Sequence, residues 1–214
     1  MFLTNYIESI SKELSKDLPG YDAHLEMMPE SRIRAMHTIK NYDEARKSGV
    51  LILLYPDKDK LMTVFILRPE YDGVHSSQVA FPGGKFEDKD CNLINTALRE
   101  ANEEVGINTS KVKIIGLLSE LYIPPSNFLV QPVVGYAKEK PQFVKDDKEV
   151  SMIIETELDE LINPLNKSMQ EIKLANNLKI NAPCYLIKDQ IIWGATAMIV
   201  SELIVILNKA TQSL

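Results

Sequence analysis

Residues 81–107 read FPGGKFEDKDCNLINTALREANEEVGI, and this stretch decides which fold the chain adopts. It predicts a strand that ends at Pro82 and a helix from about Asn92 to Val105. One stripe of that helix is apolar, formed by Ile94, Leu98, Ala101 and Val105. Gly106 follows, in the position where helices commonly end in a left-handed residue without a Cβ. The stretch therefore predicts a strand, a loop and a helix with one face packed against a core.

Three glutamates crowd the last turns of this helix. On a helical wheel, Glu100, Glu103 and Glu104 fall within about 100° of each other, on a flank beside the apolar stripe. Like charges at these spacings repel, and the partial negative charge of the helix end adds a second penalty. A hard divalent cation reverses both penalties, because Mg²⁺ takes carboxylate oxygens as ligands. The alternative is an acidic helix end that faces solvent.

The neighbours of these glutamates strengthen the case for a site. Arg99 lies one turn before Glu103, and we expect it to orient that carboxylate by a charge-assisted hydrogen bond. Gly83 and Gly84 lie between the strand and the helix, and paired glycines let the backbone approach a ligand closely. Alone, such a pair is more often a turn. Together with the acidic helix, it predicts backbone and carboxylates that converge on one ligand.

These residues resemble the sequence signature of the Nudix hydrolases. That signature is a glycine, five residues, a glutamate, seven residues and then R-E-U-x-E-E-x-G-U, where U is a bulky aliphatic residue. Residues 99–107, REANEEVGI, match its second half except that Ala101 is small. Asp90 stands in place of the isolated glutamate, and the stretch up to Arg99 is one residue longer than usual. The resemblance implies a Nudix fold of the α/β (α+β) class, with a mixed β-sheet sandwiched between α-helices.

The departures from the general signature resemble the coenzyme A pyrophosphatase branch of the family. That branch shares the longer loop and the alanine after Arg-Glu, and it has a second motif upstream. The residues that match the upstream motif are Arg68, His75, Gln78, Ala80 and Phe81. Its leucine, arginine and glycine are replaced by Asp72, Gly73 and Ser77. The missing arginine matters, because a guanidinium in that loop is an expected partner for a substrate phosphate.

The resemblance implies roles for three sets of residues. The ligands of a Mg²⁺ or Mn²⁺ ion would be Glu100, Glu103, Glu104 and the carbonyl of Gly83. The residues that take part in catalysis would be Arg99, Glu103 and Glu149. The residues that bind substrate would be Arg68, His75, Gln78, Phe81 and Gly84. Together they would serve the hydrolysis of a nucleoside diphosphate linked to another group.

Several of these roles have a plain structural alternative. Glu149 lies in the run KDDKE, which is also typical of a charged surface loop, so the choice between Glu103 and Glu149 as the base that activates water is open. His75 either contacts substrate or is an ordinary polar loop residue. Arg68 either meets a phosphate or solvates the end of a strand. His24 has no partner at metal-ligand spacing.

Three functions are compatible with the sequence. The first is cleavage of coenzyme A or its thioesters to 3′,5′-ADP and 4′-phosphopantetheine. The second is cleavage of another nucleoside diphosphate derivative, such as NADH or ADP-ribose, and the arginine missing at Gly73 favours it. The third is a Nudix-like nucleotide-binding module without turnover. Against the third stand the intact residues Arg99, Glu100, Glu103 and Glu104.

The rest of the chain predicts a single domain, residues 41–214, preceded by an N-terminal helix and an irregular lead-in over residues 1–40. Helices are expected over Asn5–Leu18, about Asn92–Val105 and about Thr196–Asn208. Buried strands are expected over Gly49–Tyr55 and Leu61–Leu67 as a hairpin, and then in HSSQVAFP, KVKIIGLLSELYI, FLVQPVVGYA, EVSMIIETEL, APCYLI and QIIWGA. Strands in bulk with a few helices packed against them are typical of an α+β or α/β sandwich.

Composition narrows the partners and the compartment. A net charge of −6 without basic clusters argues against a nucleic-acid-coating surface. Two cysteines without CxxC spacing fit a reducing compartment. The N-terminus lacks the apolar core of a signal peptide, and AMIVSELIVIL is expected to be too short to span a bilayer. We therefore expect a cytoplasmic protein with a small-molecule nucleotide substrate and neither a nucleic-acid nor a membrane partner. A homodimer is compatible with the sequence.

Overall fold

The computed structural model describes residues 2–35, 44–69, 78–174 and 177–214. The helices are α1 (Phe2–Leu14), α2 (Tyr21–Leu25), α3 (Glu30–Ala35), α4 (Leu93–Val105), α5 (Leu158–Ile162) and α6 (Gly194–Gln212), with short 3-10 turns η3 (Asp88–Asp90), η4 (Thr109–Lys111), η5 (Pro124–Ser126) and η6 (Pro164–Asn166). The strands are β1 (Arg46–Asp57), β2 (Lys60–Leu67), β3 (Val79–Ala80), β4 (Gly83–Lys85), β5 (Val112–Leu117), β6 (Leu121–Ile123), β7 (Phe128–Ala137), β8 (Met152–Glu157), β9 (Lys167–Lys173), β10 (Lys179–Ile187) and β11 (Gln190–Trp193).

Eight strands of the described residues form one mixed sheet with the central path β3-β2-β1-β7-β5. β1 and β7 run parallel, whereas β4 pairs antiparallel with β1 and β6 pairs antiparallel with β7. The expected hairpin is confirmed, since β1 and β2 pair antiparallel with Tyr55 opposite Met62. The expected strand in EVSMIIETEL is also confirmed as β8, which runs into α5. Of HSSQVAFP, only β3 is a strand among the described residues, and residues 70–77 lie outside them.

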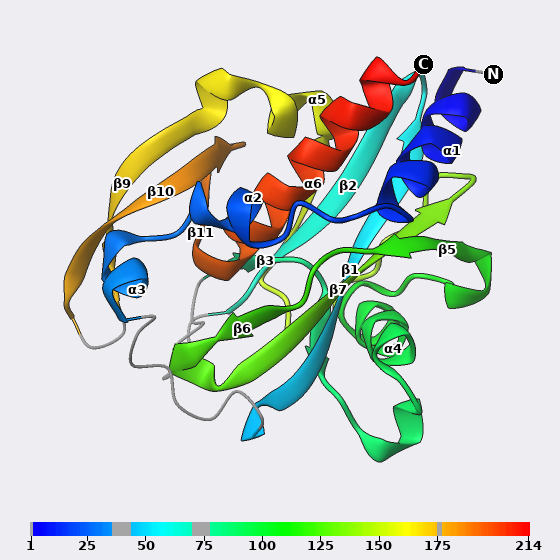
Figure 1. The fold of residues 1–214 in the computed structure, drawn as a ribbon. Coiled ribbons are helices and arrows are strands. Elements are labelled where there is room, and N and C mark those ends of the chain that lie inside the picture. The colour runs from blue at the N-terminus through cyan, green and yellow to red at the C-terminus, as the bar shows by residue number, and fades with distance from the viewer. Residues whose placement is uncertain (1, 36–43, 70–77, 175–176) are drawn as a thin grey trace.

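The sheet separates two hydrophobic cores, because successive side chains of β1 point to opposite faces. Ile52 and Leu54 face the first core, which they share with buried residues of α1 and α6. Leu51 and Leu53 face the second core, which they share with α4. Helices therefore cover both faces of the sheet (Figure 1). The expected class, a mixed sheet sandwiched between helices, is confirmed.

α1 ends earlier than the sequence predicted, at Leu14 rather than Leu18. The hydroxyl and the backbone N–H of Ser15 both donate to the carbonyl of Lys12, at 2.8 and 3.3 Å, which closes the last turn. The residue before Pro19 is also disfavoured in a helical conformation. α1 nevertheless packs along α6 and contributes apolar side chains to the first core, as Figure 1 shows. The division between residues 1–40 and 41–214 stays a prediction.

α6 is longer than predicted, and the expectation that its apolar stretch is too short for a bilayer was wrong. The helix has 19 residues, and among the described residues it is the one helix long and apolar enough to cross a membrane by length and composition. However, 61% of its apolar window is buried inside the protein. It lies against α1, β10 and β11 and supplies the first core with buried side chains. α6 is thus a core helix of this fold.

Glu202 is a fully buried carboxylate in the middle of α6. It accepts hydrogen bonds from the backbone N–H of Gly20 (3.0 Å), from Nε2 of His24 (3.0 Å), and from the hydroxyl (2.6 Å) and backbone N–H (3.1 Å) of Ser119. Burial raises the pKa of Glu202, but the hydrogen bonds from His24 and Ser119 outweigh it and leave the pKa below its ordinary value. This cluster fastens the lead-in segment and the β5–β6 loop to α6, and it gives His24 a partner that sequence spacing did not reveal.

A second, three-stranded antiparallel sheet has the order β11-β10-β9. The late hairpin expected in APCYLI and QIIWGA is confirmed as β10 and β11. β9 was not predicted. Its sequence, KSMQEIK, alternates exposed and partly buried residues but carries only two apolar side chains, so its periodicity was too weak to identify a strand.

Replacement of Glu202 by alanine tests the cluster. We expect the free energy of unfolding at pH 7 to fall by about 3–4 kcal/mol, because the change leaves buried donors without an acceptor. Since the folded pKa of Glu202 is lowered, its stabilisation is full above the pKa of an unfolded glutamate and is lost as the pH falls through the folded pKa. Urea denaturation at pH 7 and in acid measures both effects. The exposed Glu139→Ala is the control, and a similar loss in both variants would contradict the assignment.

Candidate functional site

α4 is held close to the sheet at the point where the predicted acidic residues begin. The side chain of Asn92 caps its first turn by accepting from the N–H of Asn95 at 2.9 Å, and Gly106 ends the helix in the left-handed conformation. A Cβ on Gly49 of β1 would lie 2.4 Å from the carbonyl oxygen of Leu93. The absence of that side chain therefore lets α4 lie directly on β1, and the predicted helix is confirmed.

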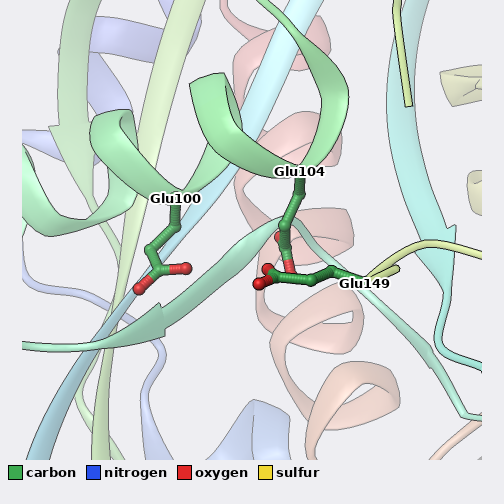
Figure 2. Close-up of side chains that lie close together, drawn as sticks. All are labelled: Glu100, Glu104 and Glu149. Carbon is green, nitrogen blue, oxygen red and sulfur yellow. The ribbon is translucent and has the colours of Figure 1, made fainter. Parts of the chain in front are cut away.

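Three carboxylates converge beside β4. Glu100 and Glu104 come from α4, and Glu149 comes from the loop before β8; one oxygen of each lies within 4.8 Å of the others. Figure 2 shows the two helix side chains on the same side of α4 and Glu149 reaching towards them from the loop. Glu104 is buried, Glu100 is half-buried and Glu149 is exposed. The fold thus brings a residue 45 positions after Glu104 onto the acidic face of the helix.

Glu104 is the most constrained of the three. Its Oε2 accepts from the backbone N–H of Gly83 at 2.8 Å, and its Oε1 lies 3.5 Å from Nη2 of Arg68. Burial raises the pKa of Glu104 to about 7, with Glu100 and Glu149 adding to the rise and Arg68 and Gly83 opposing it. Burial likewise raises the pKa of Glu100, against the effect of Arg99. Burial therefore disfavours the ionised form of two acids of the cluster, despite the arginines beside them.

Glu103 does not join this cluster. Its carboxylate is 48% exposed and accepts from Nη1 of Arg99 at 2.8 Å, which is the hydrogen bond that the sequence predicted. The same Nη1 lies 3.0 Å from Glu100. Arg99 thus holds two of the three glutamates of its own helix, one towards the cluster and one away from it.

Arg99 is itself held by Asp90, whose contacts the sequence did not predict. Nε and Nη2 of Arg99 donate to the two carboxylate oxygens of Asp90, at 2.7 and 3.0 Å. Asp90 is buried and also accepts from the hydroxyl of Thr96 and the N–H of Glu87. The hydrogen bonds from Arg99 hold the pKa of Asp90 well below its usual range. Asp90, which replaces the expected isolated glutamate, therefore fixes the orientation of the Arg99 guanidinium.

The glycine pair lies where the carboxylates converge. A Cβ on Gly84 would lie 2.5 Å from the carboxyl carbon of Glu100, so a side chain there would displace that glutamate. The carbonyl of Gly83 accepts from Nη2 of Arg68 at 3.0 Å. Arg68 therefore contacts both the backbone of β4 and Glu104.

The remaining predicted site residues lie in different surroundings. Phe81 is 2% exposed and packs its ring 4.5 Å from that of Phe65, inside the first core. The backbone carbonyl of Gln78 accepts from the N–H of Arg68 at 3.1 Å, next to β3. His75 lies outside the described residues.

The sequence match agrees with this geometry. A family model described as the NUDIX domain matches residues 45–176, which contain β1, the glycine pair, α4 and Glu149. The chain belongs to the Nudix family.

Known Nudix proteins resemble the chain over most of its length. It is 37% identical over 162 residues to "Uncharacterized Nudix hydrolase NudL" of Yersinia pestis (strain Pestoides F), with 74% of this chain and 78% of the relative covered. The protein of the same name from Yersinia pseudotuberculosis (serotype O:1b, strain IP 31758) gives the same values. Among solved structures, a C. elegans Ap4A hydrolase in a binary complex has a TM-score of 0.49 at 14% identity and covers 78% of this chain and 96% of its own. The chain is a Nudix hydrolase, which acts on diphosphate bonds.

The acidic cluster of this Nudix domain fits a divalent cation. Glu100, Glu104 and Glu149 offer only carboxylate oxygens, which are the ligands that Mg²⁺ and Mn²⁺ accept. Burial and, to a smaller extent, the neighbouring acids raise the pKa of Glu104, and the attraction of a cation among them would oppose both effects. Among the described residues, this is the group of acidic, histidine and cysteine side chains close enough to hold such an ion.

Metal binding should release a proton from Glu104. Because its pKa is about 7 in the metal-free protein, the group is about half protonated at pH 7 and must ionise to bind a cation. The apparent affinity for Mg²⁺ or Mn²⁺ should therefore rise from pH 6 to pH 8 and level off above. Calorimetry in two buffers of different ionisation enthalpy measures the protons released. Glu104→Gln should abolish the release, whereas pH-independent binding without proton release would contradict this assignment.

Proposed function

We propose that this Nudix hydrolase cleaves the diphosphate of coenzyme A or its thioesters, yielding 3′,5′-ADP and 4′-phosphopantetheine, with Mg²⁺ or Mn²⁺ as cofactor. The observation that carries the proposal is the convergence of Glu100, Glu104 and Glu149 beside Gly83 and Gly84. The choice of coenzyme A is supported by the resemblance of residues 68–107 to the coenzyme A pyrophosphatase branch. Both features involve the same loop and helix.

The residues of the cluster have different roles towards the cation. Glu100 and Glu104 would be its principal protein ligands, and the carboxylate of Glu149 lies beside them on the loop before β8. Glu103 and the Gly83 carbonyl, both expected as ligands from the resemblance, are occupied by Arg99 and Arg68 in this structure. When bound, the cation withdraws negative charge from the diphosphate oxygens and favours deprotonation of a water molecule.

The chain's own cations and backbone place the substrate. Arg68 lies between Gly83 and Glu104, so its guanidinium is available to a diphosphate oxygen at the edge of the acidic cluster. Gly84 has no side chain to obstruct that approach. Phe81 supports this loop from the core, and His75 and Gln78 stay predictions as substrate contacts. Positioning and charge stabilisation of this kind supply most of the catalysis in phosphoryl transfer.

Glu149 is the better placed of the two residues considered as the base. It is exposed, and its carboxylate lies at the cluster, whereas the carboxylate of Glu103 is engaged by Arg99. A carboxylate oxygen of Glu149 would accept the proton of the attacking water. Arg99 acts as a positioning residue, because it holds Glu100 and Glu103 and is held by Asp90.

A second substrate class has its own support. Gly73 and Ser77 depart from the upstream motif of the coenzyme A branch. This departure favours a nucleoside diphosphate derivative such as NADH or ADP-ribose as the substrate.

The proposal also includes the cellular setting expected from the sequence. The enzyme would be cytoplasmic, without a nucleic-acid or membrane partner, and a homodimer is compatible with it.

Incubation with coenzyme A and Mg²⁺ or Mn²⁺ tests the substrate. We expect 3′,5′-ADP and 4′-phosphopantetheine as products by chromatography, with a higher kcat/KM than for NADH or ADP-ribose, because residues 68–107 resemble the coenzyme A pyrophosphatase branch. Acetyl-coenzyme A belongs in the same panel. Turnover of NADH or ADP-ribose without cleavage of any coenzyme A species would overturn the substrate assignment and leave the diphosphatase activity intact.

Paired substitutions test the base. Glu149→Gln should lower kcat by about 10²–10⁴-fold with little change in KM, because it removes the group that takes the proton. Glu103→Gln should lower kcat by less than about tenfold, since Arg99 keeps its bonds to Asp90 and Glu100. The pH dependence of kcat separates the two. A larger loss in Glu103→Gln than in Glu149→Gln would reverse the assignment.

A further inference from the structure

Two guanidinium groups lie at β6 and at the turn that joins it to β7. Nη2 of Arg32 in α3 donates to the carbonyl of Tyr122 at 2.5 Å. Nη2 of Arg46, at the start of β1, donates to the carbonyl of Ser126 at 2.6 Å. The guanidinium of Arg46 also covers the ring of Phe128, 4.1 Å from its centroid. The turn therefore carries two positive charges that are fixed by backbone carbonyls and an aromatic ring.

Two buried polar atoms of this group have no hydrogen-bond partner among the residues that the structure describes. They are Nε of Arg32 and Oγ of Ser126. Within the described ranges, Arg32 forms no ion pair with a carboxylate, and burial lowers its pKa. A cation withdrawn from water with an unused donor is costly unless an anion reaches it. The local chemistry therefore fits an anion that the described residues do not supply.

Strand pairing connects β4, next to the glycine pair, with β6, which leads into this turn. Lys85 of β4 pairs with Ser48 of β1, Ser48 with Val130 of β7, and Val130 with Leu121 of β6. Three strand spacings, about 14 Å, thus separate β4 from β6. The distance suits an extended substrate whose diphosphate lies at the glutamates.

The arginine of β1 shares one face of the sheet with the aromatic ring that it covers. Side chains at alternate positions of a strand share a face, so Arg46 points to the same side as Val50. Val50 and Phe128 both pack against the first core, on the side of the sheet opposite α4. Arg46 and Phe128 therefore lie together on that face.

We propose that Arg32 and Arg46 bind a phosphate monoester on the nucleoside half of the substrate, separate from the diphosphate that is cleaved. Guanidinium groups suit this role, because their fork of donors matches the oxygens of a phosphate. The inference rests on the proposed function and narrows it to derivatives of adenosine 3′,5′-bisphosphate. It also offers a second source of phosphate recognition in a chain with glycine in place of the upstream motif's arginine at Gly73.

Binding of two nucleotides tests the proposal without turnover. Calorimetry should show that adenosine 3′,5′-bisphosphate binds wild-type protein about tenfold tighter than AMP, the gain expected for one charge-assisted contact. Arg32→Gln should remove this difference and leave AMP binding unchanged. Arg34→Gln is the matched control, since Arg34 lies on the same helix, is exposed and pairs with Glu30. Equal affinity of wild-type protein for the two nucleotides would overturn the proposal.

Hydrolysis of coenzyme A and of dephospho-coenzyme A, which lacks only the 3′-phosphate, gives the second readout. Arg32→Gln should lower kcat/KM about tenfold for coenzyme A alone. An equal loss on both substrates indicates a structural role and overturns the proposal. Arg46→Gln provides the same comparison if Arg32→Gln does not fold. A preference for the bisphosphate without cleavage of coenzyme A would refute the proposed function but support this phosphate site. Cleavage of coenzyme A without that preference would support the proposed function and refute the phosphate site.

Discussion

The buried carboxylate of Glu104 is the constraint around which the site is arranged. It is 1% exposed, yet it faces two other carboxylates across less than 5 Å. The N–H of Gly83 and the guanidinium of Arg68 offset part of this repulsion, but they leave the pKa near 7. The packing of α4 on β1 therefore holds these carboxylates together, and a divalent cation bound among them would relieve their repulsion. Local destabilisation of this kind is typical of functional sites.

Such a site needs a rigid support, and two polar anchors on opposite faces of the sheet provide one. Under α4, the Asp90–Arg99 pair ties η3 to the helix and sets the direction of Glu100 and Glu103. On the other face, Glu202 accepts hydrogen bonds from two separate segments, the lead-in segment and the β5–β6 loop, and ties them to α6. Both anchors are buried acids whose hydrogen bonds hold their pKa values low, in contrast to Glu104. A buried acid that is surrounded by hydrogen-bond donors thus stabilises the fold, whereas a buried acid that is surrounded by other acids belongs to the candidate site.

Local sequence patterns predicted the elements whose causes are local. α4 was expected from its apolar stripe and Gly106, and the β1–β2 hairpin from two apolar runs around PDKDK. The predicted Arg99–Glu103 hydrogen bond follows from helical spacing alone. Prediction failed where tertiary contacts outweigh periodicity. β9 is mostly polar and is a strand because it pairs with β10. α6 extends past Asn208, where Ala210 is buried and its carbonyl accepts from the hydroxyl of Ser9 in α1.

The sequence by itself determined that a glycine pair precedes an acidic helix, and thereby the family and the class of chemistry. It also placed Glu100 and Glu104 on one flank, because helical spacing brings them together whatever the rest of the chain does. Only the tertiary structure decided that Glu149, and not Glu103, completes the cluster, and that Asp90 holds Arg99. The physical reason is that these contacts join segments whose separation follows no helical or strand period. Their approach depends on how the sheet and loops pack.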